Sequence, residues 1–588
     1  MPKPIDVLST NITIKVDGAT LQPKILDHLL EVVVDQTMGM PSMFTIRLRD
    51  NRLEFVDGSP FDLGKAVMIS ADNGNNTSVE LIKGEVTALE PSFGGGKHCE
   101  LLVRGYDKSH RLFRETRTEA YIDKKDSDIA KTIAGNAGLG SNIDATTVIY
   151  KHLYQSNQTD LAFLRERAWR IGYECFVADG TLYFRKQKTG SAETTLEWGD
   201  GYLISFEPRM TVAEQVNEVL VSGWDPKSLK KILGKSNKTT YSATPYGTGA
   251  SKGKPFGNAK QIIVDQPVIS ESEAKQLAQA RLDELNGTIV DATGLAFRSP
   301  EITAGKLLKL DKLGKRFSDT YMVTAACHRY NHQGLYTEFS VSGKRNHSVT
   351  AQMMGRDPVQ RWTGVVSAIV TDTEDSEKQG RVKVTYPWLN PDEASGWARW
   401  AAPAAGAESG IYAMPAIDEE VLVAFEHGDF NWPIIIGRLW NGKHAIPPDA
   451  ADAPAGEEST VHVWQTHTGH KLVMREDSGN ERAELITSAG HMLQLDDANK
   501  RVLLETTGGH ILELEDNGKN IKLKNSGGAL LEMDGNTGHV TLKTSGNITI
   551  KGMKIELNAT DTIDIKGMFV NVSAKGPLNL KGAVVNLN

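Results

Sequence analysis

The feature that most constrains this chain is a repeat near its C-terminus. Over residues 548–587 each unit of 15 residues reads apolar-x-apolar-x-Gly-x-x-apolar-x-apolar, and we call these units the short repeats. Apolar residues at every second position are typical of a strand with one buried face, and the glycine marks a corner between strands. We therefore expect two short strands per repeat, with their apolar side chains turned inward. These predicted interior residues are Ile548, Ile550, Ile555, Leu557, Ile563, Ile565, Val570, Val572, Leu578, Leu580, Val585 and Leu587.

The same pattern continues upstream with a longer period, in units that we call the long repeats. Leu493, Leu512 and Leu531 recur at one constant spacing, and polar turns rich in Asp, Asn, Gly and Lys separate the strand-like runs. The repeat region therefore extends over about residues 461–588. Its interior must be narrow, because Phe569 is the one aromatic residue after Trp464.

Such a stripe of apolar side chains must be buried against another protein surface. No other part of the sequence has a matching repeat, and one strand pair per repeat leaves an open edge. We expect three chains to wind around one axis, each forming one wall of a slender prism. The alternative is a β-solenoid closed within one chain, for which each short repeat offers few residues per turn.

Residues 361–440 are predicted to form a small closed barrel of the OB type. They hold six of the ten Trp residues, and Gly and Pro separate strand-like runs at 364–370, 380–388, 421–425 and 434–437. The same window has 6 basic and 12 acidic residues. A groove that follows a nucleic-acid backbone is basic, so we expect no nucleic acid as a partner.

The first 355 residues mix strands with short helices, and one helix is predicted to begin at a capping box formed by Ser270 and Glu273. The fold class is therefore mainly β. The predicted domains are hub-like β-barrels at 1–355, the OB barrel at 356–445, a linker at 446–460 and a triple-stranded β-helix at 461–588.

The sequence contains no catalytic signature. HExxH is absent, and its three cysteines lie far apart. We therefore expect neither an enzyme nor a cofactor or metal site. His470, His491 and His510 each follow a glycine at the start of a repeat. In a trimer each would form a ring of three, and the sequence leaves open whether these rings bind an ion or are neutral surface residues.

Several stretches resemble proteins of contractile injection systems. Residues 103–112 and 155–173 resemble the phage baseplate hub, whereas 380–399 and 420–437 resemble the baseplate spike barrel. Asp418 departs from that pattern, because a turn glycine is expected there. With the terminal repeat, the chain resembles VgrG, a fusion of baseplate hub and spike found in type VI secretion and in extracellular phage-tail-like particles.

The resemblance implies a structural homotrimer that adapts a hexameric inner tube to a threefold tip and pierces the target envelope mechanically. It implies inner tube and baseplate proteins as partners and transient contact with a target membrane. It also implies a PAAR-type protein that caps the tip at Asn586, Leu587 and Asn588. The type of system, the target cell, the cargo and the identity of the tip protein stay open.

Two other functions compete with this interpretation. A trimeric tailspike-like enzyme that degrades polysaccharide needs aromatic sugar platforms, which the region after Trp464 lacks. An adhesin stalk needs a signal peptide or anchor, and residues 1–6 lack the apolar stretch of a signal peptide. We expect synthesis in the cytoplasm without a signal peptide, and then assembly into a particle that is released or membrane-anchored.

Overall fold

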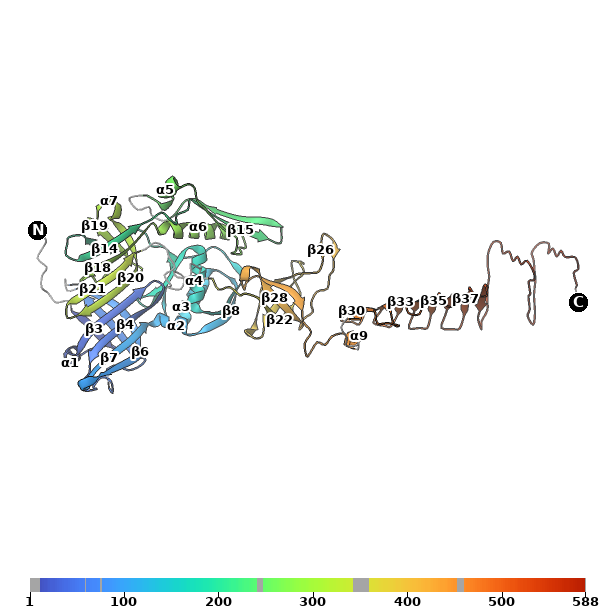
Figure 1. Cartoon of the computed structure of the whole chain (residues 1–588), viewed down its shortest axis with the longest axis horizontal. Coiled ribbons are helices and arrows are strands. Elements are labelled where there is room, and N and C mark those ends of the chain that lie inside the picture. The colour runs from blue at the N-terminus through green and yellow to red at the C-terminus, as the bar shows by residue number, and fades with distance from the viewer. Residues whose placement is uncertain are drawn as a thin grey trace. The chain divides into compact units, whose positions relative to one another are not determined.

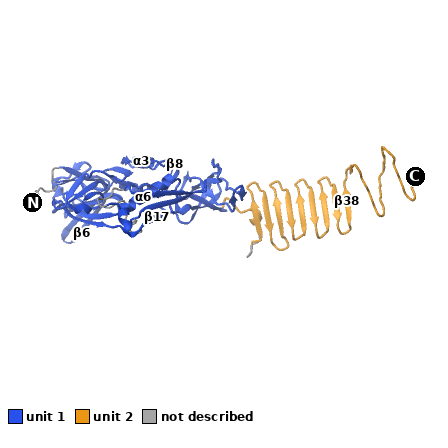
Figure 2. Cartoon of the chain, turned by 90° about the horizontal axis from the view of Figure 1, so that it is seen from above, with its two compact units in different colours: residues 1–441 blue, residues 442–588 orange. Residues whose placement is uncertain are grey.

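The computed structural model describes residues 11–58, 60–73, 77–240, 247–341, 359–451 and 459–586 (Figure 1). The chain falls into two compact units, 1–441 and 442–588 (Figure 2). Strands make up most of the regular structure in both units, which confirms the mainly β fold class. The predicted boundary at residue 355 and part of the predicted linker, 452–458, lie outside the described residues. None of the described helices is long and apolar enough to cross a membrane.

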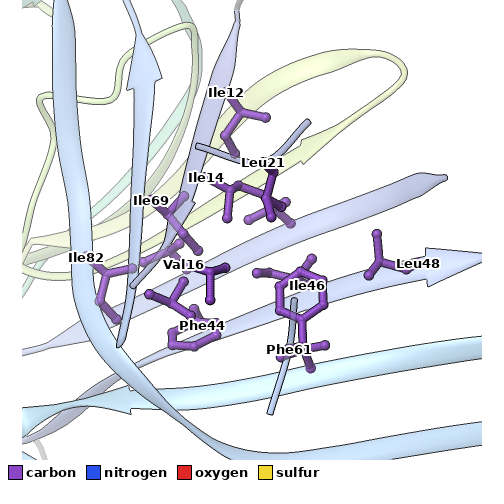
Figure 3. Packing of buried hydrophobic residues seen from close by; sticks show 14 of the residues in the cluster. Ile12, Ile14, Val16, Leu21, Phe44, Ile46, Leu48, Phe61, Ile69 and Ile82 are labelled. Carbon is purple, nitrogen blue, oxygen red and sulfur yellow. The ribbon is translucent and has the colours of Figure 1, made fainter. Parts of the chain in front are cut away.

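The first unit is built around one large sheet with the order β14-β18-β21-β20-β3-β4-β7-β6-β5-β1-β2, to which β13 and β19 are joined. Alternate residues of its strands point into a core that includes Ile14, Phe44, Ile46 and Ile69 (Figure 3). The strands are β1 (Ile12–Val16), β2 (Ala19–Thr20), β3 (Leu29–Thr37), β4 (Met40–Arg49), β5 (Ala66–Asp72), β6 (Ser78–Gly94), β7 (His98–Asp107), β13 (Thr194–Glu197), β14 (Leu203–Met210), β18 (Val290–Phe297), β19 (Leu307–Asp311), β20 (Asp319–Asn331) and β21 (Gly334–Val341).

Helices and three small sheets complete the hub part of this unit. The small sheets have the orders β10-β8, β11-β12-β9 and β16-β15-β17. Their strands are β8 (Thr116–Lys124), β9 (Gly140–Ile143), β10 (Tyr150–Thr159), β11 (Tyr173–Ala178), β12 (Thr181–Lys186), β15 (Glu218–Asp225), β16 (Lys230–Ser236) and β17 (Lys260–Ile263). The helices are α1 (Pro23–Leu26), α2 (Arg111–Arg114), α3 (Asp126–Asn136), α4 (Asp160–Ile171), α5 (Gly249–Gly253), α6 (Glu271–Gly287) and α7 (Gly314–Phe317).

The predicted capping box is found in a modified form at the start of α6. The Ser270 hydroxyl accepts a hydrogen bond from the Glu273 backbone N–H. The Glu273 carboxylate instead accepts from the backbone N–H of Ile269 and pairs with Arg170, with an N–O distance of 3.1 Å. The residue that the sequence pattern places in a local cap therefore also joins α6 to α4.

Gly234 of β16 lies close against the helix α6, and the same helix packs on β15 (Figure 1). A Cβ atom added at Gly234 would collide with the backbone carbonyl group of Ala274 in α6. Backbone atoms cannot swing aside, so Gly234→Ala is expected to push the helix off the sheet and lower the free energy of unfolding by about 1–3 kcal/mol. Urea unfolding measures this change. Gly135→Ala is the matched control, since its added Cβ would meet no atom within 4 Å.

Residues 365–438 form the predicted barrel. The order β22-β28-β29-β25-β23 closes through β22–β23 pairing, and β24 extends it. The strands are β22 (Val365–Asp372), β23 (Arg381–Tyr386), β24 (Asn390–Ala394), β25 (Ala398–Trp400), β28 (Glu420–Phe425) and β29 (Pro433–Arg438), and an arm carries β26 (Ala405–Gly406) and β27 (Ser409–Gly410). Asp418, where a turn glycine was expected, has φ 68°, which is the left-handed conformation that favours glycine.

An aromatic cluster joins the barrel to β10 of the hub. Tyr154 packs 5.1 Å from the Phe430 ring, centroid to centroid, and its backbone N–H donates to Asn431 Oδ1 at 2.7 Å. Trp362 packs against the same Phe430 ring and donates its indole N–H to Ser156 Oγ at 3.2 Å. Trp362 therefore contributes to a packed junction between domains.

The second unit consists of one sheet in which nine consecutive strands pair antiparallel in chain order (Figure 1). The short helix α9 (Pro448–Ala451) precedes them. The strands are β30 (Val461–Gln465), β31 (Lys471–Arg475), β32 (Arg482–Ile486), β33 (Met492–Asp496), β34 (Arg501–Glu505), β35 (Ile511–Glu515), β36 (Asn520–Lys524), β37 (Leu530–Asp534) and β38 (His539–Lys543).

The short repeats differ from expectation. Between residues 544 and 586, all of which are described, no segment is a strand. One chain on its own therefore forms none of the strands expected in the short repeats, and their formation in a trimer stays a prediction. The reason is physical, because a strand needs a hydrogen-bonded neighbour and these segments find none within the chain.

Candidate assembly surface of the C-terminal sheet

The register of β30–β38 sorts its side chains onto two faces. Each strand has five residues, and directly paired residues point to the same side of an antiparallel sheet. The second and fourth positions of the strands therefore form two parallel columns on one face, which we call the apolar face. One column holds Trp464, Leu472, Leu485, Leu493, Leu504, Leu512, Leu523, Leu531 and Leu542, and the other holds His462, Met474, Ala483, Leu495, Val502, Leu514, Ile521, Met533 and Val540.

The apolar face is uncovered in a single chain. Leu485 is 53% exposed, Leu523 is 54% exposed and Leu542 is 55% exposed. Contiguous aliphatic surface of this kind is rare on a monomer and marks an interaction site. The leucines of the long repeats thus lie together on one face, as their period predicted.

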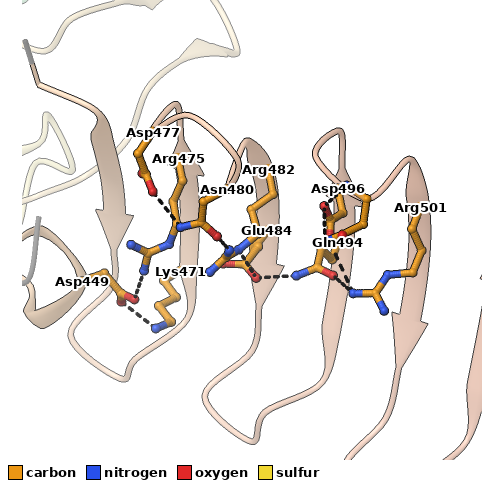
Figure 4. A network of polar contacts seen from close by, with 11 residues as sticks. Asp449, Lys471, Arg475, Asp477, Asn480, Arg482, Glu484, Gln494, Asp496 and Arg501 are labelled. Carbon is orange, nitrogen blue, oxygen red and sulfur yellow. Dashed lines mark hydrogen bonds and ion pairs between the residues drawn. The ribbon is translucent and has the colours of Figure 1, made fainter.

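The opposite face, which we call the polar face, carries a hydrogen-bonded network (Figure 4). The Gln494 amide donates to Glu484 Oε1 at 2.8 Å, and Arg501 donates to Gln494 Oε1 at 2.9 Å. Farther along, Lys522 lies between two glutamates of neighbouring strands, with N–O distances of 3.8 and 3.9 Å. Partly exposed ion pairs contribute only about 0.2–1 kcal/mol each. The charged and amide groups of the strands thus gather on this face, where their network leaves Glu484, Gln494 and Asp496 buried.

The surroundings of Asp496 on the polar face favour the ionised form of its carboxyl group. Burial alone would raise the pKa of its carboxyl group, but hydrogen bonds from Asn499 and the nearby Arg501 guanidinium lower that pKa below its usual value. Asp496 thus stays ionised at neutral pH.

Within the predicted linker, Asp449 holds α9 against the polar face of β31. Its carboxylate accepts from Lys471 Nζ at 2.6 Å and from Arg475 at 3.0 Å. Sequence reasoning missed this contact, because a charge pair so far apart along the chain leaves no periodic signal.

The interior residues predicted for the short repeats are not brought together in one chain. Ile548, Ile555, Ile563 and Val570 are each half exposed, on segments without strand partners. Their assignment to an interior stays a prediction.

The predicted tip residues lie at the end of the described chain. Asn586 is exposed, whereas Leu587 and Asn588 lie outside the described residues. Their contact with a cap protein likewise stays a prediction.

The three histidines lie in turns along one edge of the sheet. His470, His491 and His510 each follow a glycine that has positive φ. Within the described part of one chain, no three His, Cys, Asp or Glu residues come together as a metal site. Ion binding by rings formed between chains remains untested.

Two parts of the first unit match known families. Residues 6–332 match the family described as Alg8 N-terminal domain, and residues 366–440 match the type VI secretion system/phage-baseplate injector OB domain. The chain is 28% identical over 228 residues to the actin cross-linking toxin VgrG1 of Vibrio cholerae, a match that covers 35% of this chain and 20% of that protein. It is 34% identical over 110 residues to the type VI secretion system spike protein VgrG3 of Vibrio cholerae, covering 18% of this chain and 10% of that protein.

The fold has a solved counterpart. A chain of the lidded Francisella PdpA-VgrG complex superposes with a TM-score of 0.51 and 9% identity, covering 86% of this chain and 81% of the matched chain. The matches to the two Vibrio proteins span only a fifth or less of their lengths. The Alg8 N-terminal domain match covers more than half of this chain. The chain therefore belongs to the Alg8 N-terminal domain family and is similar, over part of its length, to VgrG spike proteins.

Proposed function

We propose that this protein forms a homotrimer that serves as the central spike of a contractile injection apparatus and pierces the target envelope mechanically. The observation that carries the proposal is the apolar face of β30–β38. Two columns of mainly aliphatic side chains are exposed on one face, while the Asp, Glu, Lys and Arg side chains of these strands all lie on the other, together with some apolar residues. Three copies that turn their apolar faces to one axis bury these columns and leave the polar faces in water.

The two kinds of repeat support two modes of association. Strands β30–β38 already pair within one chain, so in this region copies meet through side chains. The segments 544–586 have no strand partners in the chain, so their main-chain N–H and C=O groups need partners from other copies. We place the intertwined triple-stranded part of the spike there and the three-walled prism before it.

The proposed partners are those that the resemblance to VgrG implies. The hub ring adapts a hexameric inner tube to the threefold spike, baseplate proteins surround it, and a PAAR-type protein caps the tip at Asn586, Leu587 and Asn588. We propose synthesis in the cytoplasm, assembly into the particle and transient contact with the target membrane. The protein acts without catalysis. The scarcity of aromatic residues after Trp464 argues against the polysaccharide-degrading alternative.

Light scattering of the purified full-length chain tests the proposal. A trimer has three times the mass of one chain, which is 64.3 kDa. A chain ending at residue 460 keeps the first compact unit and its own cores, and it is expected to be monomeric. A full-length protein with the mass of one chain and a folded C-terminal region would contradict the trimer and favour a single-chain solenoid.

A further inference from the structure

We infer that hydrogen bonds between stacked turns, which we call latches, hold successive hairpins together along both edges of the β30–β38 sheet. His470 and His491 are the side chains that form the latches at one edge. This assigns to these histidines a role within one chain that does not depend on the proposed trimer. The strands have only five residues each, so each strand pair is held by a short ladder of hydrogen bonds. Contacts between turns would resist peeling where such a sheet begins to open.

On the histidine edge, each imidazole reaches the next turn. His470 Nδ1 accepts a hydrogen bond from the backbone N–H of Ser488 at 3.2 Å. One repeat later, His491 Nδ1 accepts from the backbone N–H of Thr507 at 3.4 Å. The two contacts join equivalent atoms in successive repeats, which makes them a pattern and not an isolated contact.

The glycines that precede the histidines show independently that these turns are stacked. A Cβ atom added at Gly490 would lie 3.0 Å from Thr507 Cγ2, and one added at Gly469 would lie 3.8 Å from Ser488 Cβ. The backbone of each glycine therefore lies directly against the same turn to which the histidine that follows it is hydrogen-bonded.

Each of these turns is also closed within itself. The Thr466 hydroxyl accepts from the backbone N–H of His470, and the Thr487 hydroxyl accepts from that of His491. The histidine backbone is therefore held in its own turn by a hydrogen bond, and its imidazole bonds to the following turn.

The opposite edge is latched by asparagine side chains. Asn536 Nδ2 donates to the Gly518 carbonyl at 2.9 Å, and Asn517 Nδ2 donates to the Asn499 carbonyl at 3.4 Å. These two contacts again join equivalent positions in successive turns.

Backbone groups reinforce the asparagine edge. The Gly535 N–H donates to the Lys519 carbonyl at 2.8 Å, which ties the turn of Asn536 to the turn of Gly518 a second time. Successive hairpins are thus tied at both edges, by side chains of different chemistry.

The geometry also assigns the histidine tautomer. A ring nitrogen that accepts from a backbone N–H carries no proton, so Nδ1 is the bare nitrogen and Nε2 carries the hydrogen in the neutral ring. The Nδ1 lone pairs of His470 and His491 are thereby occupied within the chain.

Amide hydrogen exchange of full-length variants, resolved to single amides by mass spectrometry, tests the latch. His491→Phe keeps a ring but removes the acceptor, whereas His491→Asn loses the ring and places an acceptor oxygen near the position of Nδ1. Thr507 N–H is expected to exchange about fivefold faster in His491→Phe, the effect of losing one ordinary hydrogen bond, and to return toward the wild-type rate in His491→Asn.

Asn536→Asp is the matched control for the opposite edge, because it keeps the side-chain shape and removes the donor to Gly518. It is expected to leave Thr507 exchange unchanged and to speed exchange of the Gly535 N–H. The inference is overturned if Thr507 exchanges at the wild-type rate in His491→Phe, or equally fast in His491→Asn and His491→Phe. Light scattering on the same samples reports the trimer separately, so failure of the latch and failure of the trimer are distinguishable.

Discussion

Leu512→Asp is expected to leave the full-length chain monomeric. Leu512 lies in the middle of the apolar face, paired directly with Leu504 and Leu523, and is 37% exposed in one chain. In the proposed trimer each copy would lose about 0.5–1 kcal/mol of side-chain burial, because only the part of Leu512 that is exposed in one chain is newly buried there. Three carboxylates would also be brought together without partners in an apolar interior, which costs several kcal/mol more per ion. The mass by light scattering should fall from that of three chains to the 64.3 kDa of one chain.

The control is the neighbouring position on the polar face. Glu513→Ala removes a side chain that lies near Arg501 and Lys522 at 3.7 and 3.8 Å. Because such exposed pairs contribute about 0.2–1 kcal/mol, this variant should remain trimeric. Ile565→Asp should behave like Leu512→Asp, since it places the same charge in the predicted interior of the short repeats. A trimeric Leu512→Asp protein would show that the apolar face is not the interface.

The parts that the sequence predicted well are those with a periodic or local signal. The evenly spaced leucines of the long repeats predicted one apolar face, and direct pairing places Leu493, Leu504 and Leu512 in one column. The strand-like runs of the barrel also have counterparts in β22, β23, β28 and β29. In both cases alternate residues report which side chains share one face of the strand, and no distant partner is needed to see it.

The parts that the sequence could not predict depend on distant partners. Tyr154 lies in the hub sequence but packs with Phe430 of the barrel. Asp449 lies in a stretch that reads as a linker, yet it holds α9 to Lys471 and Arg475. The short repeats show the converse, because their pattern predicts strands whose neighbours the single chain does not contain.

Deleting Glu513 is expected to be far more damaging than replacing it by alanine. Side chains of a strand alternate between faces, so a one-residue deletion turns all following apolar residues of that strand to the opposite side. In β35, Leu512 and Leu514 would become adjacent and could no longer both lie on the apolar face. One leucine would then face the polar neighbours Arg501 and Lys522, and one of the two apolar columns would be broken in the middle of the sheet.

Two measurements on the deletion and the alanine variant separate loss of register from loss of one side chain. The deletion should abolish the trimer in light scattering. It should also speed amide exchange in β35 and in its two hydrogen-bonded neighbours, β34 and β36. The alanine variant should keep both the trimer and the slow exchange. Equal behaviour of the two variants would mean that the turns at 506–510 and 516–519 absorb the shift, so that alternation along the strand does not determine which side chains reach the interior.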